Sequence, residues 1–410
     1  MVLLHLAAGF LAVVAPTSAL IFEVPASAPR NASAQLAEAP VGLSDRATYD
    51  ASSSSAVTYT VADPADAPSS LTFGPPFIAL AADYDGQVII GLNRRLNNQS
   101  NTIAAATLAK DTIQNLYAIE LGNEPNFFSA SDPIADGGSW DAAADYKSQV
   151  AWQDAVCQNL SSSDLISAGV YFGTSPMSIS GLSSVEGEAN DLVKDYCSHN
   201  YPQSPNTADL AGLMSHSGIA SQIQPFAAEA SAAASKGKAH IFGETNSGNC
   251  ILLRDANYSY GHAGPYCWWG RYNMGAPYYG AYFATMALAN ADQIAPLDDQ
   301  TTPYAAYAIY QDGAPSRVLL YNSDYYTNGT RPSQTFTLNG LTSSSVTAKR
   351  LTAPDSTSRV DQGQVPTVAG RTFANETCVI QGDEVIETST VSSGSATFTL
   401  SASEALLVYL

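Results

Sequence analysis

Positively charged side chains are scarce in this sequence. Its 410 residues include 17 Lys and Arg against 37 Asp and Glu, so the formal net charge is −20 at pH 7. Proteins bind nucleic acid and anionic membrane surfaces through clustered Lys and Arg. Neither partner is therefore expected. The acidic composition instead fits a soluble, secreted protein that works at acidic pH.

Long apolar runs and cysteines are also scarce. Beyond the N-terminus, no stretch approaches the roughly 18 apolar residues of a membrane span, so no membrane anchor is expected. The sequence has 5 Cys, an odd number, so at least one thiol has no partner within the chain. The cysteine spacings match no metal site, and no His-x-x-x-His pair occurs. Neither a metal nor any other cofactor is therefore expected.

Sequence signatures of several enzyme classes are missing as well. The chain contains no phosphate-binding loop, no dinucleotide-binding glycine pattern and no Gly-x-Ser-x-Gly nucleophile turn. Phosphate, hydride-transfer and serine-nucleophile chemistry are therefore unsupported.

Two stretches that are present have the same form. Residues 117–126 read YAIELGNEPN, and residues 239–246 read AHIFGETN. Each is an apolar run, typical of a buried strand, that ends at Gly and a nearby Glu. Glu124 and Glu244 are thus predicted at the carboxyl ends of parallel strands, where barrel enzymes place their chemistry. Two carboxylates facing one pocket are what retaining glycoside hydrolysis requires, although either alone is more typical of a solvated loop residue.

These motifs carry a resemblance to a known family. IELGNEPNFF and IFGETNS resemble the acid/base and nucleophile strands of glycoside hydrolase family 79, in a large clan of retaining glycosidases with (β/α)8 barrels. The Asn-Glu-Pro triplet is shared across that clan. The segment YCSHNYPQS and the C-terminal half are similar to the fungal β-glucuronidase-like branch. The resemblance extends over roughly residues 45–410.

The resemblance implies roles for five residues. Glu124 would be the acid/base and Glu244 the nucleophile, while Asn123 would bind the 2-hydroxyl group of the sugar. Tyr201 would contact nucleophile and sugar, and Tyr279 would belong to a substrate-binding loop. The alternatives are a rim position for Tyr201 and packing between domains for Tyr279.

Other polar residues have weaker claims. His199 and His216 fit buried core histidines better than ligands. A glucuronide carries a carboxylate, for which Arg254 and Arg271 are possible partners.

The pattern of the chain predicts four segments. Residues 1–19 read as a secretory signal peptide, and 20–44 as an N-terminal segment in which LIFEVP could add a strand to the β-domain. Residues 45–295 alternate strand and helix patterns, which predicts a (β/α) barrel catalytic domain. Residues 296–410 contain short alternating strands, which predicts an antiparallel β-sandwich.

Two local expectations complete the description. Residues 45–75 are rich in Ala, Ser, Asp and Pro and predict a loop or weakly structured segment, while 219–237 predict a helical segment. Secretion agrees with six glycosylation sequons, at Asn31, Asn98, Asn159, Asn257, Asn328 and Asn375.

The barrel is predicted to be incomplete, because a (β/α)8 barrel needs eight strands and only five are convincing. These are Val88–Asn93, Ile119–Gly122, Leu165–Phe172, Val193–His199 and Ala239–Gly243. Compared with the family pattern, strands and helices are missing before DRATYD and after GETNSGNC, unless a divergent strand such as CILLRD lies there. We therefore expect a gapped barrel in which Glu124 and Glu244 still face each other, poor solubility and weak or no activity.

The predicted function is that of a secreted, retaining, exo-β-glucuronidase-like glycoside hydrolase with a carbohydrate substrate. One alternative is another β-glycosidase of the same clan that takes a neutral sugar. A second alternative is a non-catalytic carbohydrate-binding or structural protein that kept both glutamates.

Overall fold

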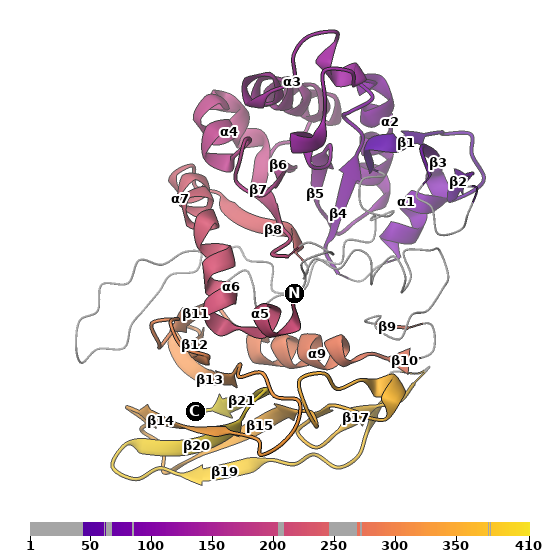
Figure 1. Cartoon of the computed structure of the whole chain (residues 1–410). Coiled ribbons are helices and arrows are strands. Elements are labelled where there is room, and N and C mark those ends of the chain that lie inside the picture. Colours follow the sequence, from indigo (N-terminus) through magenta and orange to yellow (C-terminus); the bar gives the residue numbers. More distant parts are fainter. Residues whose placement is uncertain are drawn as a thin grey trace. The chain divides into compact units, whose positions relative to one another are not determined.

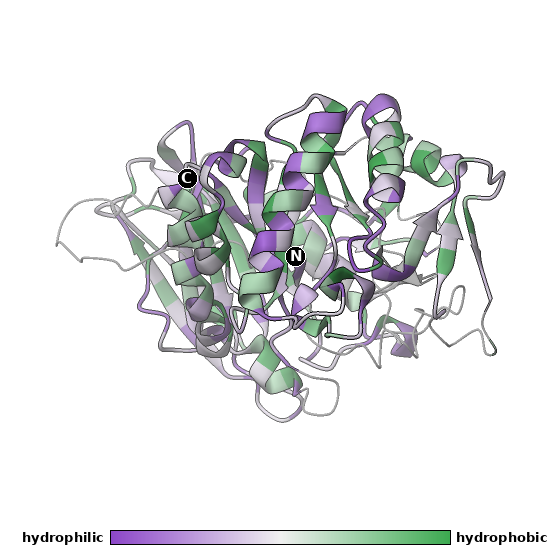
Figure 2. Cartoon of the chain, turned by 90° about the horizontal axis from the view of Figure 1, so that it is seen from above, coloured by the Kyte–Doolittle hydropathy of each residue, from purple (hydrophilic) through white to green (hydrophobic). Residues whose placement is uncertain are grey.

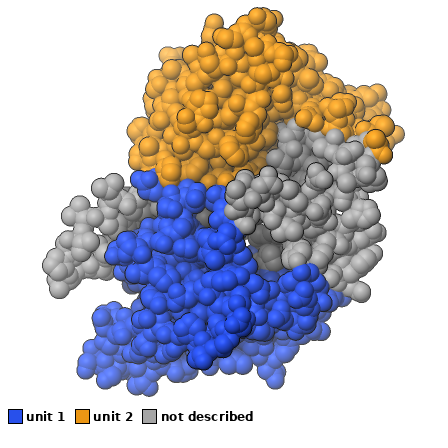
Figure 3. Space-filling model, viewed as in Figure 1, with its two compact units in different colours: residues 1–26, 202–224, 246–410 blue, residues 27–201, 225–245 orange. Residues whose placement is uncertain are grey.

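The computed structural model describes residues 44–60, 62, 68–83, 86–203, 209–245, 269–270, 273–375, 377 and 379–410. The chain divides into two compact units (Figure 3). The half-barrel unit contains the described residues up to Tyr201 and Pro225–Thr245. The C-terminal unit contains Pro202–Gln224 and the described residues from Asn246 to Leu410. The signal peptide predicted at 1–19, the LIFEVP segment, Arg254 and Arg271 lie outside the described residues.

The half-barrel unit is built on a 5-stranded parallel sheet that curls (Figure 1). Its strands, in spatial order, are β4 (Val88–Leu92), β5 (Leu116–Leu121), β6 (Ile166–Phe172), β7 (Val193–Asn200) and β8 (Ala239–Thr245). Spatial order follows chain order, and a segment that contains helices connects each strand to the next, as parallel pairing requires. The five predicted strands are confirmed, and the barrel is incomplete among the described residues, which do not include the CILLRD segment.

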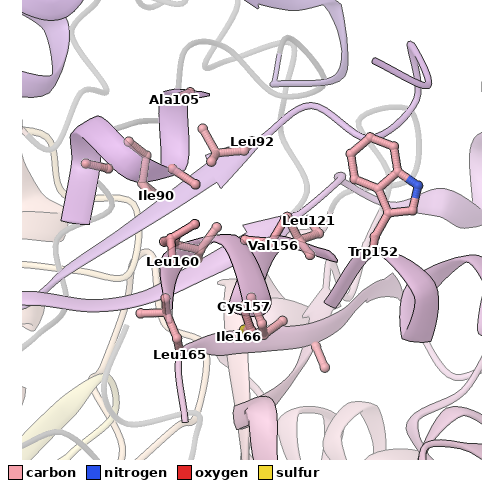
Figure 4. Packing of buried hydrophobic residues seen from close by; sticks show 14 of the residues in the cluster. Ile90, Leu92, Ala105, Leu121, Trp152, Val156, Cys157, Leu160, Leu165 and Ile166 are labelled. Carbon is pink, nitrogen blue, oxygen red and sulfur yellow. The ribbon is translucent and has the colours of Figure 1, made fainter. Parts of the chain in front are cut away.

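Helices α2 (Gln99–Thr112) and α3 (Ala142–Leu160) pack against this sheet. Trp152, Val156, Cys157 and Leu160 occupy positions i, i+4, i+5 and i+8 of α3 and therefore share one buried face. Figure 4 shows this face against residues of the strands, including Leu121. The Asp141 carboxylate accepts the Ala144 N–H at 3.0 Å and caps the start of α3.

The remaining helices are short. The α-helices are α1 (Pro75–Ala82), α4 (Ile179–Val185), α5 (Leu210–Met214), α6 (His216–Ile223), α7 (Ala227–Ser235) and α9 (Ala276–Leu288). The 3₁₀ turns are η2 (Ser44–Arg46), η3 (Pro125–Phe127), η4 (Pro133–Ala135), η5 (Gly187–Leu192), η6 (Gln224–Phe226) and η7 (Val360–Gln362). None of the described helices is both long and apolar enough to cross a membrane.

One of the two local predictions was wrong. Within residues 45–75, predicted as a loop, β1 (Ala47–Tyr49), β2 (Val57–Tyr59) and β3 (Leu71–Phe73) form a 3-stranded sheet of order β1-β3-β2. Their short apolar patterns are hidden among Ser, Asp and Pro residues. The helical prediction for residues 219–237 is confirmed, since α6, η6 and α7 follow one another from His216 to Ser235. Pro225, which has no N–H, lies in the 3₁₀ turn between the two α-helices.

The C-terminal unit is antiparallel, as predicted. Its 7-stranded sheet contains β11 (Gln293–Pro296), β12 (Tyr304–Gln311), β13 (Ala314–Asn322), β21 (Glu404–Tyr409), β15 (Ser345–Thr352), β16 (Thr367–Val368) and β19 (Glu387–Thr390). Three strand pairs complete the unit: β14 (Ser333–Asn339) with β20 (Ser395–Ser401), β9 (Trp269–Gly270) with β10 (Asn273–Met274), and β17 (Thr372–Phe373) with β18 (Ile380–Gln381).

Alternation along β13 and β21 gives this unit two apolar layers. Leu320 and Leu406 pack with β14 and β20, while the intervening Leu319 and Leu407 pack with α9. Figure 2 shows hydrophobic and hydrophilic residues together along the helices, as expected of helices with one buried face. Because α9 and Pro202–Gln224 belong to this compact unit, its extent differs from the predicted boundary at residue 295.

Candidate active site

The turn that carries Glu124 has an unusual backbone. Gly122 has a φ of 86° and Glu124 a φ of 46°, in the left-handed region that non-glycine residues seldom occupy. Such a conformation costs of the order of 1–3 kcal/mol and persists where surrounding contacts enforce it. One such contact comes from β6, where Val170, with a φ of 56°, forms a bulge. Its carbonyl accepts the Glu124 N–H at 3.0 Å.

A buried ionic network contacts the backbone of this turn. Arg94 is 0% exposed, donates from Nε to the Leu121 carbonyl at 3.0 Å and pairs with Asp145 on α3. Asp45 accepts the Asn123 N–H at 2.9 Å. Burial raises the pKa of Asp45 to about 7, although the Asn123 N–H and Arg94 oppose this shift. The network fixes the chain just before Glu124, at Leu121 and Asn123.

Glu244 is held on β8 beside a residue that must be glycine. A Cβ atom at Gly243 would lie 2.5 Å from Sγ of Cys197 and 3.1 Å from Oε1 of Glu120. Because Gly243 has no side chain, β8 can lie close to Cys197 and Glu120. The Tyr201 hydroxyl, at the end of β7, donates to Oε2 of Glu244.

His199 lies between the two glutamates. Its Nδ1 atom is 2.9 Å from Oε1 of Glu124 and 3.6 Å from Oε2 of Glu244. The contacting atoms of all three residues lie within 4.8 Å of one another. Burial alone would lower the pKa of His199, but Glu244 and Glu124 raise it to about 9. A positive charge at His199 therefore balances two carboxylates that are 8% and 6% exposed.

A second buried layer lies behind His199. Oε1 of Glu120 is 3.6 Å from Sγ of Cys197. One side-chain atom from each of Glu120, Cys197 and His199 lies within 4.8 Å of the other two. Burial raises the pKa of Glu120 to about 7, and the positive charge of His199 opposes that shift. Nε2 of His199 is buried and has no hydrogen-bond partner among the described residues. The sequence analysis missed Glu120, although a carboxylate inside an apolar strand was a visible signal.

Comparison with known proteins decides the family. Residues 306–407 match the model of the glycosyl hydrolase family 79 C-terminal beta domain. The crystal structure of a 4-O-α-L-rhamnosyl-β-D-glucuronidase from Fusarium oxysporum 12S, in complex with Rha-GlcA, is 65% identical with a TM-score of 0.84. The alignment covers 90% of this chain and 86% of that chain. This chain belongs to glycoside hydrolase family 79.

Other solved structures are far less similar to this family 79 chain. A family 51 α-L-arabinofuranosidase from Bifidobacterium longum is 13% identical, with a TM-score of 0.49 over 82% of this chain and 78% of that chain. A bifunctional glucanase-xylanase from a metagenome library is 11% identical, with a TM-score of 0.44 over 76% and 68%. Neither adds to the argument. No curated protein sequence matched.

The structure brings together most of the predicted site residues of this family 79 chain. Glu124, Glu244 and Tyr201 are in one cluster, and half-buried Asn123 precedes Glu124 on the turn. His199, expected to be a core histidine, is fully buried but contacts both glutamates.

Tyr279 and His216 lie in the other unit. The Tyr279 side chain is 1% exposed, packs against Phe373 and accepts the Phe373 N–H at 3.1 Å. These contacts lie within the C-terminal unit, so they show neither the predicted substrate-binding role of Tyr279 nor the predicted packing between domains. His216 contacts the Thr302 carbonyl and the Tyr307 hydroxyl, as expected of a satisfied core histidine.

A proton competes with any metal at the His199 cluster. Among the described residues, Glu120–Cys197–His199 and Glu124–His199–Glu244 are spaced closely enough to ligate an ion. A metal-binding histidine must be neutral. Because Glu244 and Glu124 raise the pKa of His199, the protonated ring is favoured there.

Proposed function

We propose that this chain is a retaining β-glucuronidase in which Glu244 is the nucleophile and Glu124 the acid/base. One observation carries the proposal: carboxylate oxygens of Glu124 and Glu244, from the ends of two strands, lie within 4.8 Å of each other. Retaining glycosidases hold their carboxyl groups about 5–5.5 Å apart, whereas inverting ones need about 6.5–9.5 Å to admit a water molecule. The short separation favours double displacement.

The contacts around Glu244 and Glu124 agree with these two roles. The Tyr201 hydroxyl orients Glu244, which attacks the anomeric carbon and forms a glycosyl-enzyme intermediate. Glu124 protonates the departing glycosidic oxygen and then removes a proton from the attacking water. The Nδ1 atom of His199 contacts Oε1 of Glu124 and thereby orients Oε2 toward the substrate. The positive charge of His199 also offsets the repulsion between the neighbouring carboxylates of Glu124 and Glu244.

The relative with 65% identity supports a glucuronide as substrate, since its structure holds Rha-GlcA. We propose that this chain acts on the same class, a β-linked glucuronic acid with or without a rhamnosyl group on O4. In a protein of net charge −20, the sugar carboxylate must find local donors, among which backbone N–H and tyrosine hydroxyl groups are suitable.

Hydrolysis assays test this proposal against its alternatives. Protein recovered from culture medium, where the proposed secretion would place it, is incubated with aryl β-glucuronide, β-glucoside and β-galactoside. We expect hydrolysis of the glucuronide alone, with a bell-shaped rate profile centred below neutral pH. Turnover of a neutral glycoside instead would support another glycosidase of the clan. No turnover of any substrate at high protein concentration would support the non-catalytic alternative.

A further inference from the structure

Three aromatic side chains form a row along the ends of three neighbouring strands of the half-barrel. Phe127 follows β5, Phe172 ends β6 and Tyr201 follows β7. The ring centroids of Phe127 and Phe172 are 5.1 Å apart, and those of Phe172 and Tyr201 are 6.1 Å apart. The Phe172 and Tyr201 rings are nearly parallel, at 13°. We call Phe127 and Phe172 the aromatic platform.

The platform is open to solvent. Phe127 is 58% exposed and Phe172 is 36% exposed, whereas the other described aromatic residues of this unit are buried or half-buried. Single exposed apolar residues are common on proteins, but adjacent aromatic rings beside a catalytic pair indicate a binding surface. Neither ring carries charge, so the platform suits a ligand with an apolar face.

The backbone of the platform is fixed to the catalytic turn. Oδ1 of Asn126 accepts the Phe172 N–H at 2.8 Å, and the Phe127 N–H donates to the Glu124 carbonyl at 2.9 Å. Phe127 therefore lies on the same 3₁₀ turn, η3, that begins at Glu124. A surface held in this way is organised before the ligand arrives, which reduces the entropy lost on binding.

The position of the platform identifies what it would bind. Glu124 protonates the oxygen that joins glucuronic acid to the leaving group, so a ring on the Glu124 turn lies on the leaving-group side. Tyr201, at the other end of the row, contacts Glu244 and so lies on the side of the glucuronic acid. We propose that Phe127 and Phe172 stack against the C–H face of a pyranose leaving group, so that the natural substrate is a glucuronyl saccharide. This inference rests on the proposed function and specifies its substrate.

Two substrates with different leaving groups test the platform. A β-glucuronyl-galactose disaccharide can reach it, whereas the fluoride of β-glucuronyl fluoride is too small. For Phe127→Ala and Phe172→Ala we expect kcat/KM on the disaccharide to fall about tenfold more than on the fluoride. Leu80→Ala on α1 is the matched control, because Leu80 is 57% exposed in the same unit. It should change neither rate.

Equal losses on both substrates, or no loss on the disaccharide, would overturn the platform. If the unmodified protein cleaves neither substrate, the proposed function fails, and the platform is judged by binding instead. Saturation-transfer NMR should then show contact of the galactose ring with the unmodified protein and none with the double variant. Contact that survives in the double variant, or is absent from both proteins, would refute the platform.

Discussion

Replacing Glu244 with Ala is expected to abolish hydrolysis of β-glucuronides, because no group remains to form the glycosyl-enzyme intermediate. Azide can occupy the space of the lost carboxylate and attack the anomeric carbon directly. It should restore cleavage of an activated aryl glucuronide and give the α-glucuronyl azide, with inverted configuration.

The matched variant Glu124→Ala should respond differently. Loss of the acid/base lowers the rate by about 10²–10⁴-fold. Azide should then intercept the intermediate on Glu244 and give the β-glucuronyl azide, with retained configuration. Glu188→Gln, an exposed carboxylate of the same unit, serves as the control and should behave like the unmodified protein. An α-azide from Glu124→Ala and a β-azide from Glu244→Ala would show that the two roles are reversed.

His199→Gln is expected to cause the second large effect. The variant leaves two buried carboxylates without the cation between them, so we expect kcat to fall about 10²-fold. Stability should fall as well. The pKa of His199 is raised from its ordinary 6.5 to about 9, so folding is favoured by the charged ring. A shift of this size corresponds to of the order of 3 kcal/mol.

The pH dependence of the loss follows from the sign of that shift. Because the folded-state pKa is the higher one, the stabilisation is complete below pH 6.5 and is lost as pH rises through about 9. Urea unfolding should therefore separate His199→Gln from the unmodified protein strongly at about pH 6 and weakly above about pH 9. His240→Gln, on β8 with Nε2 3.0 Å from the Ser198 hydroxyl, is the control. A loss for His199→Gln that is independent of pH would mean that the ring acts only by packing.

The sequence was sufficient for the five strands of the parallel sheet and for the positions of both glutamates. Buried parallel strands appear as apolar runs, and the two runs that lead to Glu124 and Glu244 each reach a glycine close to the glutamate. The boundaries were less accurate: β5 begins at Leu116, three residues before the predicted Ile119. Polar or aromatic residues at strand ends do not show where pairing begins.

The residues that hold the two glutamates in place could not be predicted in the same way. Arg94 and Asp145 pair across 51 residues of chain, and no local pattern links them. The bulge at Val170 depends on the register between β6 and β7, which is a property of the pair of strands. His199 resembled a core histidine because a single histidine in a strand carries no information about what faces it. Only the fold brings it against two glutamates.

The incomplete sheet bears on how much activity to expect. Among the described residues, the ends of five parallel strands carry Glu124, Glu244, Tyr201 and the aromatic platform. Loops that follow other strands of a complete barrel would normally add substrate contacts. We therefore expect this chain to hydrolyse its substrate but to bind it weakly, which would appear as a high KM.

The most direct test of the account is covalent trapping with a 2-deoxy-2-fluoro-β-glucuronyl fluoride. This reagent slows breakdown of the intermediate more than its formation, so even a slow retaining enzyme accumulates the adduct. Peptide mass spectrometry should find one added fluoroglucuronyl group on the peptide containing Glu244, and none when Glu244 is replaced. An adduct on Glu124, or hydrolysis of the reagent without any adduct, would contradict the assignment of Glu244 as nucleophile.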